Sequence, residues 1–149
     1  MIKKPLNTTK FIPLLILATV VILLFFINNT DPLEVSINRD DSFFWDFDIV
    51  DNQVQIQCFV TLINNTDTDK TVTITGHFPD DVENGLLKEA DLTAVDENGE
   101  TAKFVVSADS EQPFEVIFIG QCGGGNTKHD KNLPDIDITV IDSDESESN

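Results

Sequence analysis

From residue 33 onward, apolar and polar residues alternate with a period of two along most of the chain. Successive side chains of a β-strand point to opposite faces, so this period is typical of strands that are buried on one face. The clearest run is Val54 to Leu62, where apolar residues alternate mainly with glutamine and threonine, and Phe59 is the exception. Turn-forming residues separate such runs. The sequence therefore predicts an all-β domain over residues 33–141.

Seven or eight short strands are expected, which in a domain of this size favours a β-sandwich of immunoglobulin type. Val82 to Leu87 indicates one short helical turn between strands. In the second run the apolar residues Phe43, Trp45, Phe47 and Ile49 share one face, so we expect all four in the core. The predicted strands are Leu33–Ile37, Phe43–Ile49, Val54–Leu62, Val72–Phe78, Leu92–Ala94, Ala102–Val106, Phe114–Ile119 and Ile136–Val140.

Residues 11–27 form an uncharged apolar segment in which only Thr19 is polar. At about 1.5 Å per residue, a helix over this segment is about 26 Å long, close to the ~30 Å hydrocarbon core of a bilayer. Three lysines precede the segment and acidic residues follow it. The positive-inside rule then places residues 1–10 in the cytoplasm and the chain after residue 28 outside. We predict one transmembrane helix over 11–27, with a short linker over 28–32.

A cleaved secretory signal is the alternative for the N-terminus, because it has the same basic start and a shorter apolar region. The apolar segment ends in Phe25-Phe26-Ile27-Asn28 without an Ala-x-Ala pattern, which favours the uncleaved anchor. No cysteine follows closely, so a lipoprotein signal is not expected. Either interpretation exports residues 33–141.

The chain is strongly acidic, with 27 Asp and Glu against 9 Lys and Arg and a net charge of −18. All three basic residues of the first 27 lie before the apolar segment, so residues 28–149 carry a charge of −21. Such a surface repels phosphate groups, which excludes nucleic-acid binding, and it attracts cations and basic partners. An acidic surface suited to a salty or alkaline habitat explains the same charge without a ligand. Residues 142–149 are expected to be a disordered acidic tail.

Cys58 and Cys122 are the chain's two cysteines, and outside the cytoplasm such a pair invites a disulfide. Cys58 belongs to the apolar row of its strand, and Cys122 follows a predicted central strand. A bridge between them is one expectation. The alternative is a buried free Cys58 and an exposed Cys122.

Metal binding has two sets of candidate residues. Zinc matches the ligand count of Cys58, His77, Cys122 and His129, but the spacing is not that of a structural zinc site. Calcium takes carboxylate and carbonyl oxygens, which acidic turns supply. The calcium candidates are Asp67 with Asp69, Asp80 with Asp81, and Asp96 with Asn98. None fits the EF-hand pattern, and the turn-forming preference of Asp explains each pair equally well.

Catalytic motifs give no comparable signal. The chain has no Gly-x-Ser-x-Gly elbow, and Gly123 to Gly125 lack the strand-to-helix context of a phosphate loop. The sequence predicts neither an enzyme nor a cofactor. A redox or hydrolytic envelope enzyme that uses Cys122 is the remaining alternative of that class.

Two stretches resemble the immunoglobulin-like domains that Gram-positive bacteria carry outside a lipoprotein signal or a single membrane anchor. They are the strand Val54 to Leu62 closed by Asn64-Asn65-Thr66, and the Leu92-x-x-x-Asp96-x-Asn98-Gly99 hairpin. The resemblance implies a surface domain of adhesive or unknown function. We therefore expect a single-pass binding or structural module of the cell envelope, with another envelope protein as its partner. A calcium-responsive domain is the alternative.

Overall fold

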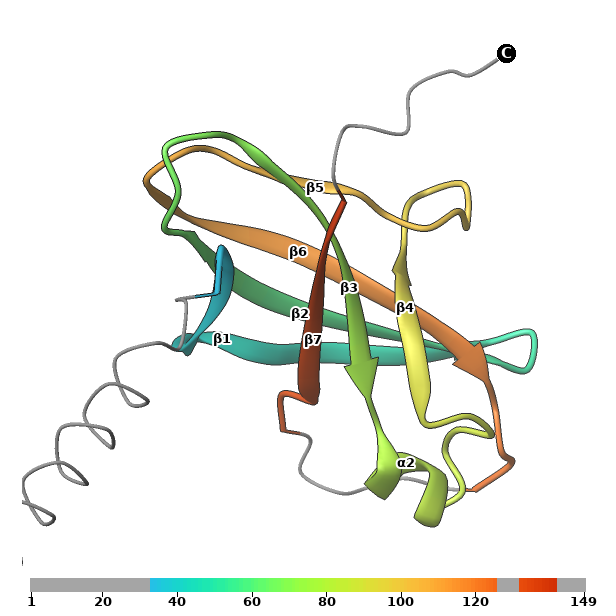
Figure 1. Cartoon of the computed structure of the whole chain (residues 1–149). Coiled ribbons are helices and arrows are strands. Elements are labelled where there is room, and N and C mark those ends of the chain that lie inside the picture. Colours follow the sequence, from blue (N-terminus) through green and yellow to red (C-terminus); the bar gives the residue numbers. More distant parts are fainter. Residues whose placement is uncertain (1–32, 126–131, 142–149) are drawn as a thin grey trace, which may run out of the picture. The chain divides into compact units, whose positions relative to one another are not determined.

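The computed structural model describes residues 33–125 and 132–141, which form an antiparallel β structure (Figure 1). The chain divides into the units Met1–Pro32 and Leu33–Asn149, and all described residues belong to the second. The elements are β1 (Val35–Val50), β2 (Gln53–Asn64), β3 (Lys70–His77), α2 (Pro79–Glu83), β4 (Asp91–Val95), β5 (Phe104–Val106), β6 (Ser110–Gln121) and β7 (Asp135–Ile141). The prediction of an all-β domain is confirmed.

The predicted anchor 11–27, the linker 28–32 and the tail 142–149 lie outside the described residues. Within the two described ranges, no helix has the length and apolar character needed to cross a membrane.

One continuous sheet is folded over on itself. Its strand order is β1-β2-β6-β4-β3-β5, and β7 pairs with the other edge of β3. The strand β4 makes the connection between the two halves, because Ala94 pairs with Phe118 of β6 while Thr93 pairs with Thr75 of β3. In Figure 1, β3 and β7 cross β1 and β2, and the core lies between these two layers.

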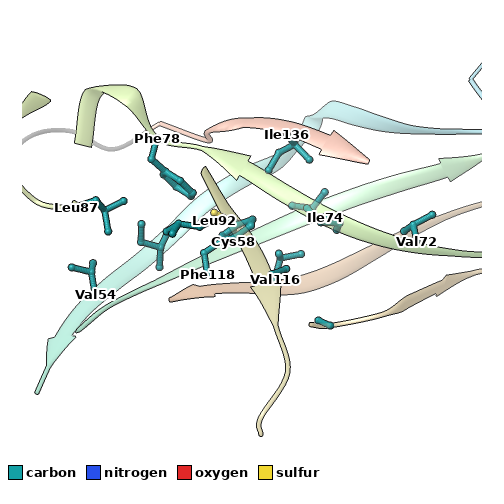
Figure 2. Packing of buried hydrophobic residues seen from close by; sticks show 14 of the residues in the cluster. Val54, Cys58, Val72, Ile74, Phe78, Leu87, Leu92, Val116, Phe118 and Ile136 are labelled. Atoms are coloured by element: carbon teal, nitrogen blue, oxygen red, sulfur yellow. The ribbon is translucent and has the colours of Figure 1, made fainter. Parts of the chain in front are cut away.

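The row of side chains along β2 is the centre of the core. Val54, Ile56, Cys58 and Val60 are buried at every second position, as the alternation predicted. Across the ladder to β6, Ile56 pairs with Phe118 and Cys58 with Val116, and these partners are also fully buried (Figure 2).

The opposite layer covers this row with Val72, Ile74 and Phe78. The rings of Phe78 and Phe118 meet edge to face at 5.3 Å, which joins the two layers. Gly76 lies beneath this contact, where a Cβ atom would come within 2.7 Å of the Phe78 ring and 3.1 Å of the Phe118 ring. Any larger residue at position 76 would have to displace one ring or the other.

The strand β1 departs from the prediction. The two expected strands are one, and its pairing with β2 is interrupted between Asn38 and Phe43 and again between Phe44 and Asp46. An extra residue in one strand re-aims the side chains that follow it. Phe47 and Ile49 therefore lie opposite the core-facing residues of β2, whereas Phe43 pairs with the outward-facing Phe59. The prediction that Phe43, Trp45, Phe47 and Ile49 share a core face was wrong.

The predicted hairpin around Asn98-Gly99 is confirmed only at its tip. Val95 forms a bridge with Thr101, and Gly99 has the positive φ of 80° that a glycine adopts without strain. Beyond this tip the chain leaves β4, and β5 pairs with β3 instead. The expected helical turn is present as α2, slightly earlier than predicted.

Replacement of Phe118 by alanine should lower the free energy of unfolding by about 3–5 kcal/mol, because it removes a fully buried ring and its contact with Phe78. Urea denaturation of the two proteins measures this difference. Val105→Ala is the matched control, since Val105 is 56% exposed, and it should change stability by no more than about 0.5 kcal/mol. A loss below about 1 kcal/mol for Phe118→Ala would contradict the described core.

Candidate functional site

Three aromatic rings meet on the outer face of the β1–β2 hairpin, the face turned away from the core. The ring centroids of Phe43 and Phe59 are 5.2 Å apart, those of Trp45 and Phe59 5.6 Å, and those of Phe43 and Trp45 6.2 Å. Trp45 meets Phe59 edge to face, which is a favoured geometry for aromatic pairs. We call Phe43, Trp45 and Phe59 the aromatic cluster.

The aromatic cluster is open to solvent although its three rings are apolar. Trp45 is 61% exposed and Phe43 is 47% exposed, while Phe59 between them is half-buried. Single exposed apolar residues are ordinary on protein surfaces, but contiguous patches mark interaction sites. The mutual packing of the three rings makes this a patch with a fixed shape.

The two irregularities in the pairing of β1 with β2 turn Phe43 and Trp45 to the outer face. Trp45 is the extra residue between the Phe44–Cys58 and Asp46–Gln57 pairs, and its ring turns toward Phe59. Ahead of it, the hydroxyl of Ser42 donates to the carbonyl of Asn38 and accepts from the backbone N–H of Thr61. The Thr61 hydroxyl donates to the carbonyl of Asp41. These bonds satisfy backbone groups that the interrupted ladder leaves unpaired.

Carboxylates border the aromatic cluster on two sides. On β1, Asp46 and Asp48 pair with the outward-facing Gln57 and Gln55. On β6, Glu115 pairs with Phe59 and so lies on the same face. The carboxylate of Asp46 accepts the backbone N–H of Phe47, and that of Asp48 accepts the backbone N–H of Ile49. The site therefore combines apolar ring surface with negative charge.

A shallow cleft of about 660 Å³ continues this face beyond Glu115. It lies over β4 and β6 and over the chain between β4 and β5. Its lining residues are Val95, Asp96, Glu97, Thr101, Ala102, Lys103, Phe104, Glu115 and Ile117. Because Glu115 belongs both to the cleft and to the border of the aromatic cluster, the two features form one continuous surface.

A separate cluster of polar side chains joins the strands β4, β3 and β7. The Nδ1 atom of His77 is 2.7 Å from a carboxylate oxygen of Asp91, and its Nε2 atom is 2.8 Å from one of Asp137. Both carboxylates favour the protonated imidazolium, so the pKa of His77 is raised, mainly by the hydrogen bond to Asp91 and then by that to Asp137. The acids lie on opposite sides of the ring, so they do not converge on one point as metal ligands would.

The three pairs of calcium candidates lie in three different turns of the chain. The Asp69 carboxylate accepts the backbone N–H of Ala108, while Asp67 is exposed in the turn after β2. The Asp96 carboxylate accepts the N–H groups of Asn98 and Glu100, and the bond from Glu100 is the main reason that the pKa of Asp96 is lowered. These are the bonds of turn-forming residues.

Asp80 and Asp81 lie in the first turn of α2, beside a cleft of about 400 Å³. Across residues 33–125 and 132–141, no three His, Cys, Asp or Glu side chains are grouped so as to hold a metal ion. Of the zinc candidates, His129 is outside the described residues.

The two cysteines are free thiols, so the expected bridge between them is not present. The register explains why: Cys58 pairs with Val116, and Cys122 follows Val116 by six residues. At about 3.3 Å per residue this separation is about 20 Å, whereas a disulfide needs Cα atoms within about 7 Å. Cys122 is buried at 8% exposure, contrary to the alternative of an exposed thiol. Burial raises the pKa of Cys58 to about 12.

No protein-family model, curated protein or solved structure matches this chain. The candidate site therefore rests on the geometry of its own residues.

The aromatic cluster is the feature that the sequence interpretation missed. Its residues were visible, but the uninterrupted alternation assigned Phe43 and Trp45 to the core. The signal that could have located the site is Phe59, an apolar residue at an outward position of the most regular strand.

The stability of the folded domain should be the same with and without a thiol reductant, because the fold holds Cys58 and Cys122 too far apart to bridge. Urea denaturation under both conditions measures this. A thiol reagent should also modify Cys58 only after unfolding, since Cys58 is fully buried. A non-reduced protein that lacked both thiols by mass and lost stability on reduction would contradict the described register.

His77 should make stability depend on pH. Its pKa is raised above the ordinary 6.5, so its stabilising effect is present in full below about pH 6.5 and is lost as the pH rises through the raised value. Wild type should therefore exceed His77→Gln in free energy of unfolding by more at pH 6 than at pH 9, as urea denaturation at about these two pH values would show. An equal difference between wild type and variant at the two pH values would mean that Asp91 and Asp137 do not raise the pKa of His77.

Proposed function

We propose that this chain is a binding module of the cell envelope, anchored by residues 11–27 and exposed on the outer side of the membrane. In this proposal it binds another envelope protein through the aromatic cluster. The observation that carries the proposal is the exposure of Trp45 and Phe43 in a packed group of rings. A group of this kind at the centre of an interface, with a polar rim around it, is where binding energy concentrates.

The location is supported by the sequence of the first unit. The apolar segment 11–27 is preceded by Lys3, Lys4 and Lys10 and followed by acidic residues. The linker 28–32 reaches less than about 20 Å when fully extended, at about 3.3 Å per residue. A partner of this domain should therefore also lie close to the bilayer.

The strand pairing supports the immunoglobulin-like form of the sandwich. In an immunoglobulin constant domain the strands A, B, E and D form one sheet, and C pairs with F in the other. The order β1-β2-β6-β4 corresponds to A-B-E-D, and the pair β3–β7 corresponds to C–F. In this chain β4 is bonded to both layers, and no counterpart of strand G is among the described residues.

A photo-crosslinking amino acid in place of Trp45, introduced into the full-length protein in intact cells, tests the binding part of the proposal. It should give a discrete higher-mass adduct, because position 45 lies at the centre of the proposed contact. The same replacement at Val105 is the matched control, since Val105 is also apolar and 56% exposed but lies on β5. Adducts of equal yield at both positions, or at neither, would contradict a site at the aromatic cluster.

The same cells test the location. A membrane-impermeant maleimide should label Asp67→Cys, in the exposed turn after β2, but should not label Asn7→Cys before the apolar segment. Detergent should make Asn7→Cys reactive. Labelling of Asn7→Cys alone in intact cells would reverse the orientation and overturn the proposal.

A further inference from the structure

We propose that the aromatic cluster and its carboxylate border recognise a cationic polypeptide segment, in which an arginine or lysine side chain lies against Trp45. This inference rests on the proposed function and adds the chemistry of the partner. The sequence alone suggested basic partners from overall charge, whereas the structure indicates where such a partner would bind.

The rings supply the first element of recognition. A guanidinium or ammonium group is attracted to the face of an aromatic ring within about 6 Å of its centroid, and tryptophan is the strongest of the three aromatic residues in this respect. Trp45 meets Phe59 edge to face and is 61% exposed, so its indole is held in place while remaining accessible. A cation that binds there also covers apolar surface with the methylene stem of its side chain.

The charges supply the second element. Asp46 and Asp48 on one side and Glu115 on the other lie on the same face as the rings. The ion pairs among residues 33–125 and 132–141 do not involve these three carboxylates: Arg39 pairs with Asp135, Lys70 with Glu34, and His77 with Asp91 and Asp137. A cation on the rings would therefore have carboxylates within reach on two sides.

The cleft beyond Glu115 supplies the third element, which is room for a chain rather than for a single side chain. It has a volume of about 660 Å³ and contains Asp96, Glu97 and Glu115 against one base, Lys103. A segment with basic residues at intervals fits this continuous surface, with one residue at Trp45 and the next over the cleft. Anionic lipid is the poorer match for the same face, since its headgroups meet these carboxylates with like charge.

The fluorescence of Trp45 tests the proposal directly, because it is the chain's single tryptophan. The probe is a short blocked peptide of alternating arginine and serine, added to the full-length protein in an uncharged detergent at low ionic strength. Saturable change in Trp45 emission is expected. The same peptide with citrulline in place of arginine keeps the shape and removes the charge, so it should bind at least about threefold more weakly.

Two variants assign the effect to the face. Asp46→Asn with Asp48→Asn keeps the side-chain oxygens that accept the neighbouring N–H groups but removes two charges. It should raise the half-saturation concentration at least about threefold. The matched control is Asp67→Asn with Glu89→Gln, which removes the same two charges at exposed positions outside the strands. This control should leave the half-saturation concentration nearly unchanged. Phe59→Leu should also weaken binding, since it removes the ring that supports Trp45.

Four outcomes would overturn the proposal. Equal binding of the arginine and citrulline peptides would show that the charge is not recognised, and equal weakening by the two charge variants would reduce the effect to the general acidic field. A shift of Trp45 emission by zwitterionic lipid vesicles but not by the arginine peptide would make the aromatic cluster a membrane contact. If the crosslink from position 45 persists in cells while the arginine peptide fails to bind, the binding module stands and only the cationic partner is wrong.

Discussion

The regular pleat of β2 is the constraint on which the rest of the structure depends. This strand pairs with β1 along one edge and with β6 along the other. A residue of β2 that is paired on both sides therefore sets which way its two partners face. Its inward row is buried without interruption from Val54 to Leu62. Where the alternation of a neighbouring strand is out of phase with that of β2, the neighbour must leave residues unpaired. The strand β1 does this at two places. The aromatic cluster lies where that mismatch occurs.

Strands with clean alternation were predictable for the same reason. The strands β2, β3 and β7 each have buried residues at the positions that the period of two assigned to the core, and β6 is the expected central strand. Alternation fails where pairing is irregular, because one inserted residue exchanges the faces of all residues beyond it. Phe43 and Trp45 were therefore placed wrongly while Phe47 was placed correctly. The partner of β5 and the distance between Cys58 and Cys122 depend on long-range register, which local patterns do not contain.

Exposure of three packed rings is costly unless it serves a purpose. Phe43 and Trp45 would face the core if β1 followed β2 without an irregularity, whereas Phe59 faces outward in either case. Burial of a large apolar side chain stabilises a fold by about 1.5–3 kcal/mol. The chain instead keeps Trp45 and Phe43 exposed to solvent, with carboxylates of β1 and β6 on two sides of the rings. Those charges limit non-specific association of an exposed apolar patch. The proposed partner would therefore have to tolerate negative charge beside the rings.

The unpaired edge of a sheet is the other place where a sandwich can bind a polypeptide, by addition of a strand. On β7 this edge carries Asp135 and Asp137, whose carboxylates are already engaged by Arg39 and His77. A strand added there would have to accommodate or displace these charged pairs, and charged edge residues are a common means of preventing such addition. On the outer face of β1 and β2, the carboxylates of Asp46 and Asp48 bond, within the described part of the chain, to backbone N–H groups of their own strand rather than to a basic side chain. The proposed recognition through this face therefore meets fewer engaged charges than strand addition at β7 would.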